Sequence, residues 1–483
     1  MTIQKLSRRT FLTTTASMGA AVAASGCAGL RRSQAARRRQ PNILFVFADQ
    51  MRAQEMGCAG HPTVRTPRLD RMASEGVRFV NAVSACPVCT PYRAALLSGC
   101  YPLTTGMFLN DLRMPTNIPT VGTVLRDEGY HMGYIGKWHL DGTNRGVFTP
   151  PGPRRQGFDD FWAVANCTHD YMKAYLYRDT PEPIWLNGYE PDVQTDIAME
   201  FLDAAPPDRP FCLFVSYGTP HNPYELMPEE YKIYRPEDIQ PRPNCPKPSL
   251  KDIAGYCSHI TALDRNMGRL LDAIDQRGLA EDTLVVFTSD HGDMLGSHGQ
   301  QRKQRPWDES ICVPFLIRQP GHVPAGIKSE AIINTPDIMP TLLSLCGAEI
   351  PPHVQGEDLS KVWTGHSRNA PTSALTACYV AFSEGKNFPE WRCVRTNRHS
   401  LVRNRLGSWM LFDNREDPYQ MNNLIESPGH SEIRSRLEKD LERWLERTGD
   451  TFEDPFYYID TFGYPVDKET KHIPYYVEYG KSD

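Results

Sequence analysis

The feature that most constrains the fold is a set of short apolar segments that alternate with helical patterns along the chain. Four of them predict strands, at residues 43–48, 134–135, 211–216 and 284–287. Continuous apolar runs of this kind are typical of strands that are covered on both faces. Longer helical stretches, notably 193–202 and 250–277, lie between them. This alternation predicts a parallel, doubly wound α/β sheet.

A further helix is expected soon after the first strand. Thr66 and Pro67 open it, Leu69 and Met72 lie on one side, and Gly76 stands where a C-cap glycine belongs. Proline in the first turn and glycine just past the end are the usual signals of helix boundaries.

Ionisable side chains follow the four predicted strands in a consistent way. They are Asp49 after the first strand, Lys137 and His139 after the second, His221 after the third, and Asp290 and His291 after the fourth. In open parallel sheets, ligands bind outside the carboxyl ends of the strands. One such residue alone has an ordinary explanation, because Asp49 could cap a helix and His221 could belong to a loop. Four strands that each deliver an ionisable group indicate a functional site at this edge.

The size and charge of the chain narrow the class of protein. Its 483 residues suffice for one large domain and a smaller one. Hydrophobic residues make up 40% and charged residues 23%, which is an ordinary balance for a soluble protein. The net charge of −5 offers no basic footprint, so no nucleic-acid partner is expected. The sequence contains no apolar run of about 20 residues, the length of a transmembrane helix.

The N-terminus has the pattern of an export signal. Arg8 and Arg9 precede a weakly apolar stretch that is rich in Ala and Thr and ends in ASGC at Cys27. Residues 1–27 resemble a bacterial twin-arginine signal with a lipoprotein cleavage box, which would make Cys27 a lipidated first residue. The basic tether 28–40 would then lie near anionic headgroups and hold the protein on a membrane. We therefore expect an exported, periplasmic or cell-surface lipoprotein; the alternative is a frayed helix with a chance pair of arginines.

The thirteen cysteines do not suggest a disulfide framework. Without Cys27 and Cys89 eleven remain, so complete pairing is impossible, and a chain of this size does not need disulfides to fold. We assign no bridges and expect most thiols to be small buried hydrophobes. Cys86 and Cys89 form a C-x-x-C pair, for which a redox pair, half a zinc site and a plain buried cysteine are alternatives. The second Cys or His pair of a zinc site is not found at suitable spacing, and a redox pair would belong to a small thioredoxin-like unit.

The segment that begins at Cys89 reads CTPYRAALLSG, and it resembles the signature of the type I sulfatases, in which C-x-P-x-R marks a cysteine for oxidation to formylglycine. Further similar segments follow one another along residues 41–430: PNILFVFADQ, TPRLDRMASEGVRFVNA, GYIGKWHL, TPHNPY, FTSDHGDMLGSHG and LFDNREDPYQMNNL. The resemblance implies an alkaline-phosphatase-like α/β/α sandwich over residues 41–370. A smaller C-terminal α+β subdomain is expected over 371–483, with short strands near 392–402 and a helix at 433–447.

The resemblance also implies that the chain supplies its own nucleophile. A hydrated aldehyde at residue 89 offers two hydroxyls on one carbon, one of which attacks sulfur to give a covalent sulfated intermediate. The other loses its proton and expels sulfate, which restores the aldehyde. At a helix start, residue 89 would lie where backbone N–H groups favour anions. Formation of the aldehyde implies a partner, either a formylglycine-generating enzyme or a radical maturase.

The roles of the site residues are carried over from the matching motifs. A divalent cation, calcium or alternatively magnesium, would be held by Asp49, Gln50, Cys89, Asp290 and His291. Arg93 and Lys137 would neutralise the hydrate and the sulfate oxygens, His139 would be the base that breaks the intermediate, and His221 and Lys303 would contact sulfate and protonate the leaving oxygen. Lys303 lies in the segment QQRKQRPWDES, where Arg302 and Arg305 are cationic alternatives.

Some positions depart from the family pattern. The family commonly has two aspartates after the first strand, whereas this chain has Asp49 and Gln50. Gln50 offers a carbonyl oxygen but no charge, so a lower metal affinity or a different ion preference is expected. Tyr92 replaces a residue that is often Ser, while the Cys, Pro and Arg of the core pattern remain. His291 is a soft partner for a hard cation and could instead lie behind the metal ligands.

The predicted function is hydrolysis of sulfate monoesters on a sulfated saccharide met outside the cytoplasm. The first alternative is a phosphonate or phosphate ester hydrolase of the same superfamily. The second is an inactive glycan-binding homologue. Only the replacement of the second aspartate by Gln50 favours this alternative, and the intact C-x-P-x-R motif argues against it. The sugar and the hydroxyl that carry the sulfate are not specified by the sequence.

Overall fold

The computed structural model describes residues 40–142, 144–382 and 388–469. The predicted twin-arginine signal, Cys27 and the tether up to residue 39 lie outside these ranges. Among the helices of the described ranges, none combines the length and the apolar character that crossing a membrane requires.

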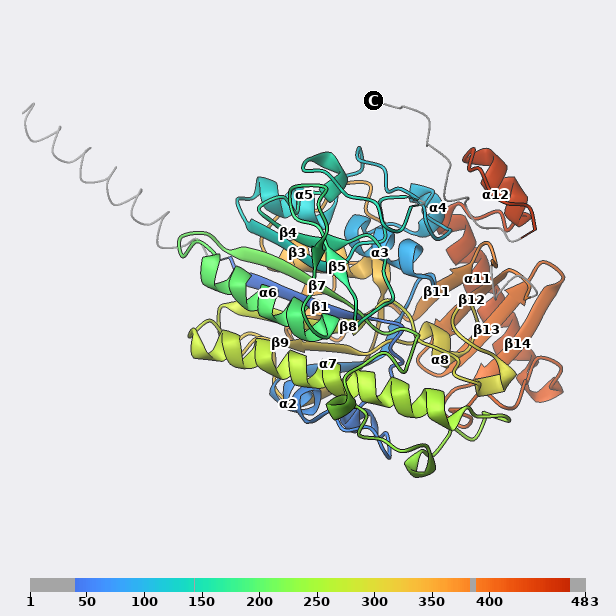
Figure 1. Ribbon diagram of the computed structural model, residues 1–483. Helices are drawn as coiled ribbons and strands as arrows, with labels where there is room; N and C mark the ends of the chain where they lie inside the picture. Colours follow the sequence, from blue (N-terminus) through green and yellow to red (C-terminus); the bar gives the residue numbers. More distant parts are fainter. Residues whose placement is uncertain (1–39, 143, 383–387, 470–483) are drawn as a thin grey trace, which may run out of the picture. The chain divides into compact units, whose positions relative to one another are not determined.

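Within the described residues, eight strands form the main sheet, in the order β10-β2-β9-β8-β1-β7-β3-β4 (Figure 1). They are β1 (Asn42–Asp49), β2 (Val77–Val83), β3 (His131–Lys137), β4 (Phe161–Ala165), β7 (Phe211–Pro220), β8 (Thr283–Ser289), β9 (Phe315–Arg318) and β10 (Ile327–Asn334). All four predicted strands, β1, β3, β7 and β8, lie side by side and run in parallel. The alternation of strands and helices therefore predicted the centre of the sheet correctly.

The prediction of a parallel sheet is confirmed for the four predicted strands, but β9, which was not predicted, is antiparallel to both β8 and β2. A parallel neighbour needs a crossover that returns the chain to the opposite edge of the sheet. The connection from β8 to β9 contains only the short helical segments η5 (Ser297–Gly299) and α8 (Asp308–Ile311), and it stays at the edge where β8 ends. The chain consequently re-enters the sheet from that edge, and residues 290–314 remain beside the candidate site.

Helices cover both faces of the main sheet, as the sandwich architecture predicts. One face carries α2 (Pro67–Glu75), α6 (Glu190–Ala204) and α7 (Leu250–Gln276); the other carries α3 (Cys89–Ser98), α5 (Val121–Asp127) and α9 (Ile338–Leu345). Alternate side chains of β1 point to opposite faces of the sheet. Phe45 packs with the second group of helices and Val46 with the first. Figure 1 shows α6 and α7 crossing one face together. The core on each face holds the carboxyl ends of the strands in a fixed position.

Gly76 has a different role from the one predicted. It follows α2, but its φ of −149° is not the left-handed conformation of a C-cap glycine. A Cβ at this position would lie 1.9 Å from the carbonyl oxygen of Ile317 in β9. Glycine is therefore required by the close approach of two backbone segments, which the sequence pattern could not reveal.

A second, antiparallel sheet forms the C-terminal part of the described chain, as predicted. Its strands are β11 (Ser373–Cys378), β12 (Trp391–Thr396), β13 (His399–Asn404) and β14 (Gly407–Asp413), and the helices that follow are α11 (Ser431–Thr448) and α12 (Pro455–Thr461). Leu437, Leu441 and Leu445 of α11 pack on the apolar side chains of this sheet. The remaining short elements are α4 (Pro102–Thr105), α10 (Ser360–Trp363), β5 (Tyr175–Leu176) and β6 (Ile184–Trp185).

The C-terminal sheet is fastened to the loop between β8 and β9. The indole Nε1 of Trp391 donates to the carbonyl oxygen of Gln304 at 3.0 Å, and the guanidinium of Arg395 forms a buried ion pair with Asp308. The backbone N–H of Gln304 in turn donates to the carbonyl oxygen of Pro87, two residues before α3. This loop is thus held between the second sheet and the start of α3.

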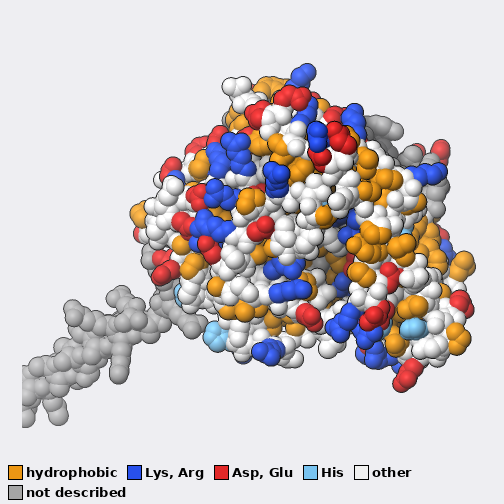
Figure 2. Space-filling view, turned by 90° about the horizontal axis from the view of Figure 1, so that it is seen from below, with side chains coloured by type: hydrophobic (Ala, Val, Ile, Leu, Met, Phe, Trp, Pro, Cys, Tyr) orange, Lys and Arg blue, Asp and Glu red, His pale blue; other side chains and the backbone are white. Residues whose placement is uncertain are grey.

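Basic and acidic side chains are interspersed over the face shown in Figure 2. This distribution agrees with the modest net charge of the chain, −5.

Candidate active site

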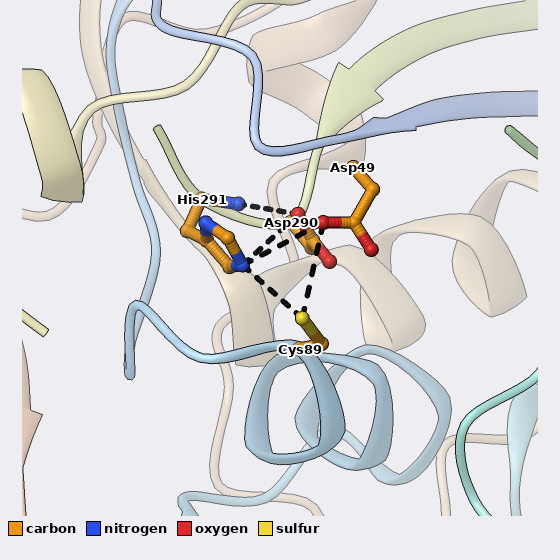
Figure 3. Close-up of side chains that lie close together, drawn as sticks. All are labelled: Asp49, Cys89, Asp290 and His291. Atoms are coloured by element: carbon orange, nitrogen blue, oxygen red, sulfur yellow. Dashed lines mark hydrogen bonds and ion pairs between the residues drawn. The ribbon is translucent and has the colours of Figure 1, made fainter. Parts of the chain in front are cut away.

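The predicted site residues converge at the carboxyl edge of the main sheet. Asp49 and Lys137 end β1 and β3, while His221 and Asp290 directly follow β7 and β8. Cys89 is the first residue of α3, and its side chain points toward Asp49 and Asp290 (Figure 3). A cavity of about 240 Å³ opens above them; of the predicted residues, Gln50, Cys89, Lys137, His139, His221 and Lys303 line it.

The Cys89 thiol lies between two ammonium groups. Its Sγ is 2.9 Å from Nζ of Lys303 and 3.8 Å from Nζ of Lys137, and it is 3.3 Å from Nε2 of His291. Burial and the charge of Asp49 oppose ionisation of this thiol, but the cationic neighbours outweigh them, so the pKa of Cys89 is well below its usual value. The position is built to stabilise negative charge on the side chain of residue 89.

Arg93 lies beneath the site, one turn along α3 from Cys89. It donates to the carbonyl oxygen of Lys137 and to Oγ of Ser216, both at 2.7 Å. Its second nitrogen is 3.3 Å from Asp49 and 3.4 Å from Asp290. Arg93 is 1% exposed and does not line the cavity, so it supports the carboxylates from behind.

Four of the predicted metal ligands form one compact group. Asp49, Cys89, Asp290 and His291 each place a ligand atom within 4.8 Å of the others. Nδ1 of His291 donates to the carbonyl oxygen of Gly292, which leaves the lone pair of Nε2 directed toward the group. Burial and the nearby charge of Asp49 raise the pKa of Asp290, and a cation between the carboxylates would relieve this repulsion.

Gln50, which follows Asp49, offers a further oxygen in this part of the site. Its Nε2 donates to Oδ2 of Asp293 at 2.7 Å, so the orientation of the amide is fixed. Its Oε1 is buried and has no hydrogen-bond partner among the described residues. A buried carbonyl oxygen without a partner is costly, and a cation beside it would satisfy it. Two carboxylates and an amide oxygen suit a hard divalent cation, so the residues present fit such an ion.

His139 is oriented by Asp111, a residue that the sequence analysis missed. Nε2 of His139 lies 2.8 Å from Oδ1 of Asp111, which also accepts from Nε of Arg145 at 2.9 Å. Burial opposes ionisation of Asp111, but the hydrogen bonds from His139 and Arg145 outweigh it and lower its pKa. Because the carboxylate accepts the Nε2 proton, Nδ1 of His139 carries the lone pair, and it has no other partner in the described structure.

His221 stacks on a second missed residue, His169. Their rings are 4.1 Å apart at an interplanar angle of 11°, and both line the cavity. Nε2 of His169 lies 3.4 Å from Nζ of Lys137. Burial together with Lys303 and the neighbouring histidine lowers the pKa of His221 well below its usual value. Burial also lowers the pKa of His169 well below its usual value.

The structure distinguishes Lys303 from its two cationic neighbours. Lys303 reaches Cys89, whereas the guanidinium of Arg302 lies over Tyr224 and that of Arg305 over Phe388. The backbone reverses sharply here, because φ is +61° at Arg302 and +70° at Gln304. In this conformation the ammonium group of Lys303 reaches Sγ of Cys89, while Arg302 also lines the cavity.

The zinc and disulfide alternatives find no support in the described residues. The twelve cysteines of this part of the chain, Cys86 and Cys89 included, are free thiols. Cys86 belongs to neither of the groups there that could hold a metal ion; the second such group is Glu55, His61 and Cys257. Burial raises the pKa of Cys86, which makes it an unreactive thiol rather than a redox partner.

Asp111, Arg145, His169 and Asp293 are the site residues that sequence reasoning did not find. Asp293 follows the fourth strand by four residues and could have been noticed in the segment SDHGDM. Asp111 and His169 lie in loops, where no periodic pattern fixes the position of a side chain. Only the packing of the loop segments around β3 and β4 brings His169 to the cavity and Asp111 to His139.

Comparison with known proteins agrees with this geometry. The model of the sulfatase family matches residues 41–348, and that of the N-sulphoglucosamine sulphohydrolase C-terminal region matches residues 296–447. The chain is 43% identical over 447 residues to an ulvan-active sulfatase of Formosa agariphila, with 90% of this chain and 87% of that protein covered. It is 29% identical to an endo-4-O-sulfatase of Bacteroides thetaiotaomicron, with coverage of 90% and 96%.

A solved structure shows the same architecture. The crystal structure of a Bacteroides fragilis protein described as the sulfatase YidJ superposes with a TM-score of 0.77 at 31% identity, and the match covers 87% of this chain and 98% of that one. Fold and site define a hydrolase of the alkaline-phosphatase-like superfamily. The chain belongs to the sulfatase family within it and is a sulfuric ester hydrolase.

Proposed function

We propose that this enzyme removes sulfate from a saccharide, using formylglycine made from Cys89 and a bound divalent cation. The position of the Cys89 side chain, between the ammonium groups of Lys303 and Lys137 and against the Asp49–Asp290 ligand group, carries the proposal. The names of the relatives, which act on ulvan or as an endo-4-O-sulfatase, support a sulfated carbohydrate as substrate.

The aldehyde requires a two-electron oxidation of the cysteine. Formally, water supplies the aldehyde oxygen, the sulfur leaves as hydrogen sulfide, and two electrons and two protons pass to an oxidant. That oxidant is dioxygen or a radical cofactor, held by a separate maturation enzyme. When hydrated, the aldehyde supplies one hydroxyl to attack sulfur and a second whose deprotonation expels the sulfate.

The cation would be held by Asp49, Gln50, Asp290 and His291, beside residue 89. When bound, a calcium or magnesium ion would offset negative charge on the sulfate and on the nucleophile. We favour calcium because the ligand atoms are mostly hard oxygens on several chain segments, without the strict geometry that magnesium demands.

Two histidines have suitable places for the two proton transfers. Nδ1 of His139 carries a lone pair and is fixed by Asp111, which suits a base. His221 and Lys303 line the same cavity and can protonate the departing sugar oxygen. An anionic sulfate ester opposes the cations that lower the pKa of His221, so the substrate itself favours the protonated form of this histidine.

We also propose that the mature protein works outside the cytoplasm as a lipoprotein anchored through Cys27. The twin-arginine pattern and the ASGC sequence motivate this proposal. A large sulfated saccharide would be met there.

The reaction is tested by parallel assay of a sulfate ester and a phosphonate ester, followed by a panel of saccharides that includes ulvan, chondroitin sulfate and heparan sulfate oligosaccharides. We expect sulfate release from at least one saccharide and little phosphonate hydrolysis. Preference for the phosphonate ester would favour the first alternative. Glycan binding without an aldehyde or any turnover would favour the inactive binder.

The nucleophile is tested by mass spectrometry of the peptide that contains Cys89. The active enzyme should show loss of the thiol and gain of a carbonyl, and activity should scale with the converted fraction. Cys89→Ala should be inactive while its thermal unfolding remains cooperative. Full activity from protein that holds only the free Cys89 thiol would refute the formylglycine mechanism.

A further inference from the structure

A row of aromatic rings, exposed at Trp185 and partly buried at its other members, lies near the cavity, and the reaction does not use it. Trp185 in β6 is 65% exposed, although tryptophan is usually well covered in folded proteins. Its ring centroid is 5.3 Å from that of Tyr175 in β5, which is 5.6 Å from that of Tyr177. Tyr177 continues the row to Phe148 at 5.6 Å. We call these four residues the aromatic rim.

The aromatic rim is continuous with the wall of the cavity. Arg145 lines the cavity, and the carbonyl oxygen of the next residue, Gly146, accepts a hydrogen bond from the hydroxyl of Tyr177 at 3.0 Å. His169 lines the cavity on the segment that leads from β4 into β5. The two cavity-lining segments, at Arg145 and at His169, therefore continue into the segments that carry the rim.

Trp185, the exposed end of the rim, lies too far from the nucleophile to contact the sugar that carries the reacting sulfate. Lys137 pairs with Ala165 of β4, Val164 bridges to Tyr177, and Tyr175 pairs with Trp185. Trp185 is thus three strands beyond Lys137, a separation of roughly 14 Å at the usual spacing of neighbouring strands. Any saccharide that contacts both places must contain several sugar residues.

We propose that the aromatic rim is a subsite that binds a sugar ring of an extended saccharide, two or more residues away from the sulfate that is removed. This inference rests on the proposed saccharide substrate. A sugar ring presents a C–H face that packs on an aromatic face while its hydroxyls stay in water. An exposed aromatic surface rimmed by polar groups, such as the exposed Lys173, suits such a ligand. The enzyme accordingly acts on chains rather than on single sugars.

The test compares wild type with Trp185→Ala on 4-nitrophenyl sulfate and on ulvan di-, tetra- and hexasaccharides. We expect KM for the hexasaccharide to rise roughly fivefold to tenfold, the usual worth of one aromatic stacking contact. We expect kcat on every substrate, and both constants for the aryl sulfate, to stay unchanged. Trp185→Phe should recover most of the loss. The matched control is Leu406→Ala, because Leu406 is 97% exposed in the turn between β13 and β14.

Equal losses of activity on all substrates would mean that the substitution disturbs the active site. Unchanged kcat and KM on the hexasaccharide would mean that the rim binds no sugar. Either result overturns the inference. Calorimetric binding of the same hexasaccharide to the Cys89→Ala protein separates this inference from the proposed function. One outcome is that the wild type desulfates no saccharide while the hexasaccharide still binds and Trp185→Ala weakens that binding. The proposed function is then wrong, and the sugar-binding role of the rim is confirmed. If the hexasaccharide neither binds nor reacts, both fail.

Discussion

At the scale of single residues, the site places its two catalytic histidines in opposite electrostatic surroundings. His139 faces the Asp111 carboxylate, whereas His221 is stacked on His169 and lies near the cations Lys303 and Lys137. A carboxylate partner stabilises the positive charge that a base acquires, and cationic neighbours favour the loss of a proton. The two environments therefore favour the roles proposed above, the base for His139 and the acid for His221.

Substitution of these histidines should affect two kinds of substrate differently. Sugar alkoxides are more basic leaving groups than aryl oxides, so their departure depends more on a proton. His221→Ala should reduce kcat on a sulfated sugar by about 100- to 10,000-fold and on an aryl sulfate much less. His139→Ala, and to a smaller extent Asp111→Asn, should slow both substrates alike and cause a sulfated enzyme to accumulate. Steady-state kinetics and intact-protein mass spectrometry measure these outcomes; equal losses on both substrates for His221→Ala would make it a sulfate-binding residue instead.

Residue 50 determines how much negative charge the proposed metal site carries. The hydrogen bond from Gln50 to Asp293 allows a test of this role. Gln50→Asp should tighten calcium binding, because it adds a carboxylate to the ligand set. Without metal, the new carboxylate should repel Asp293 and Asp290 and lower the melting temperature below that of wild type. Calcium should then raise the melting temperature of the variant more than that of wild type. Calorimetric titration and thermal melts in chelator check this, with Gln50→Ala as the uncharged control; an unchanged calcium affinity would show that residue 50 is not a ligand.

The strand-end residues of the site were predictable from sequence because strand ends are defined by local pattern. Asp49, Lys137, His221 and Asp290 each adjoin an apolar run, and parallel strands bring such positions to one edge. Asp111 and His169 depend on loop conformation, which long-range packing decides. The choice of Lys303 over Arg302 depended on a left-handed backbone turn that several residue types can adopt.

At the scale of helices and strands, the start of α6 contains a buried acid behind the site. Glu190 is 2% exposed and accepts a hydrogen bond from Gln194, and burial raises its pKa to about 8. In the unfolded chain this carboxyl ionises near 4.5, its ordinary value. Between these two values the folded state binds more protons than the unfolded state, so stability decreases as the pH rises.

Glu190→Gln should remove this pH dependence. Because of Glu190, the free energy of unfolding of the wild type should fall by up to about 1.4 kcal/mol for each pH unit between roughly pH 5 and 8. Above about pH 8 the effect of Glu190 should stay constant. The variant should therefore unfold at higher denaturant concentration than wild type at pH 8 and at nearly the same concentration at pH 5. Urea unfolding at several pH values measures the difference. A constant offset between the two proteins at all pH values would contradict a raised pKa.

Elements with strong local patterns were predicted well, and those that depend on their neighbours were not. β1, β8 and α7 match the predicted segments because their apolar sequences alone require cover on both faces or along one side. β9 has four residues, and its direction follows from the path of the loop before it. Gly76 was recognised as a helix boundary, but the contact with Ile317 that requires glycine joins residues far apart in sequence.

At the scale of the whole molecule, the proposed anchor predicts where the enzyme is found. Cys27→Ala should release the protein from the membrane fraction, because an unlipidated signal remnant binds membranes poorly. Arg8→Lys together with Arg9→Lys should block export. Cell fractionation with immunodetection measures both, and Ser25→Ala serves as a matched control within the same segment. Membrane association that survives Cys27→Ala would exclude a lipid anchor at this cysteine.

The two sheets also depend on each other for activity. The loop that carries Lys303 has little regular structure of its own, and Trp391 and Arg395 of the second sheet hold it in place through Gln304 and Asp308. Loss of the second sheet would release one of the two ammonium groups beside residue 89 while the carboxyl edge of the main sheet remained intact. Proteolytic damage near the C-terminus should therefore abolish activity while the residues around Cys89 remain folded. A polypeptide that lacks the second sheet should likewise release no sulfate, even where its main sheet is folded.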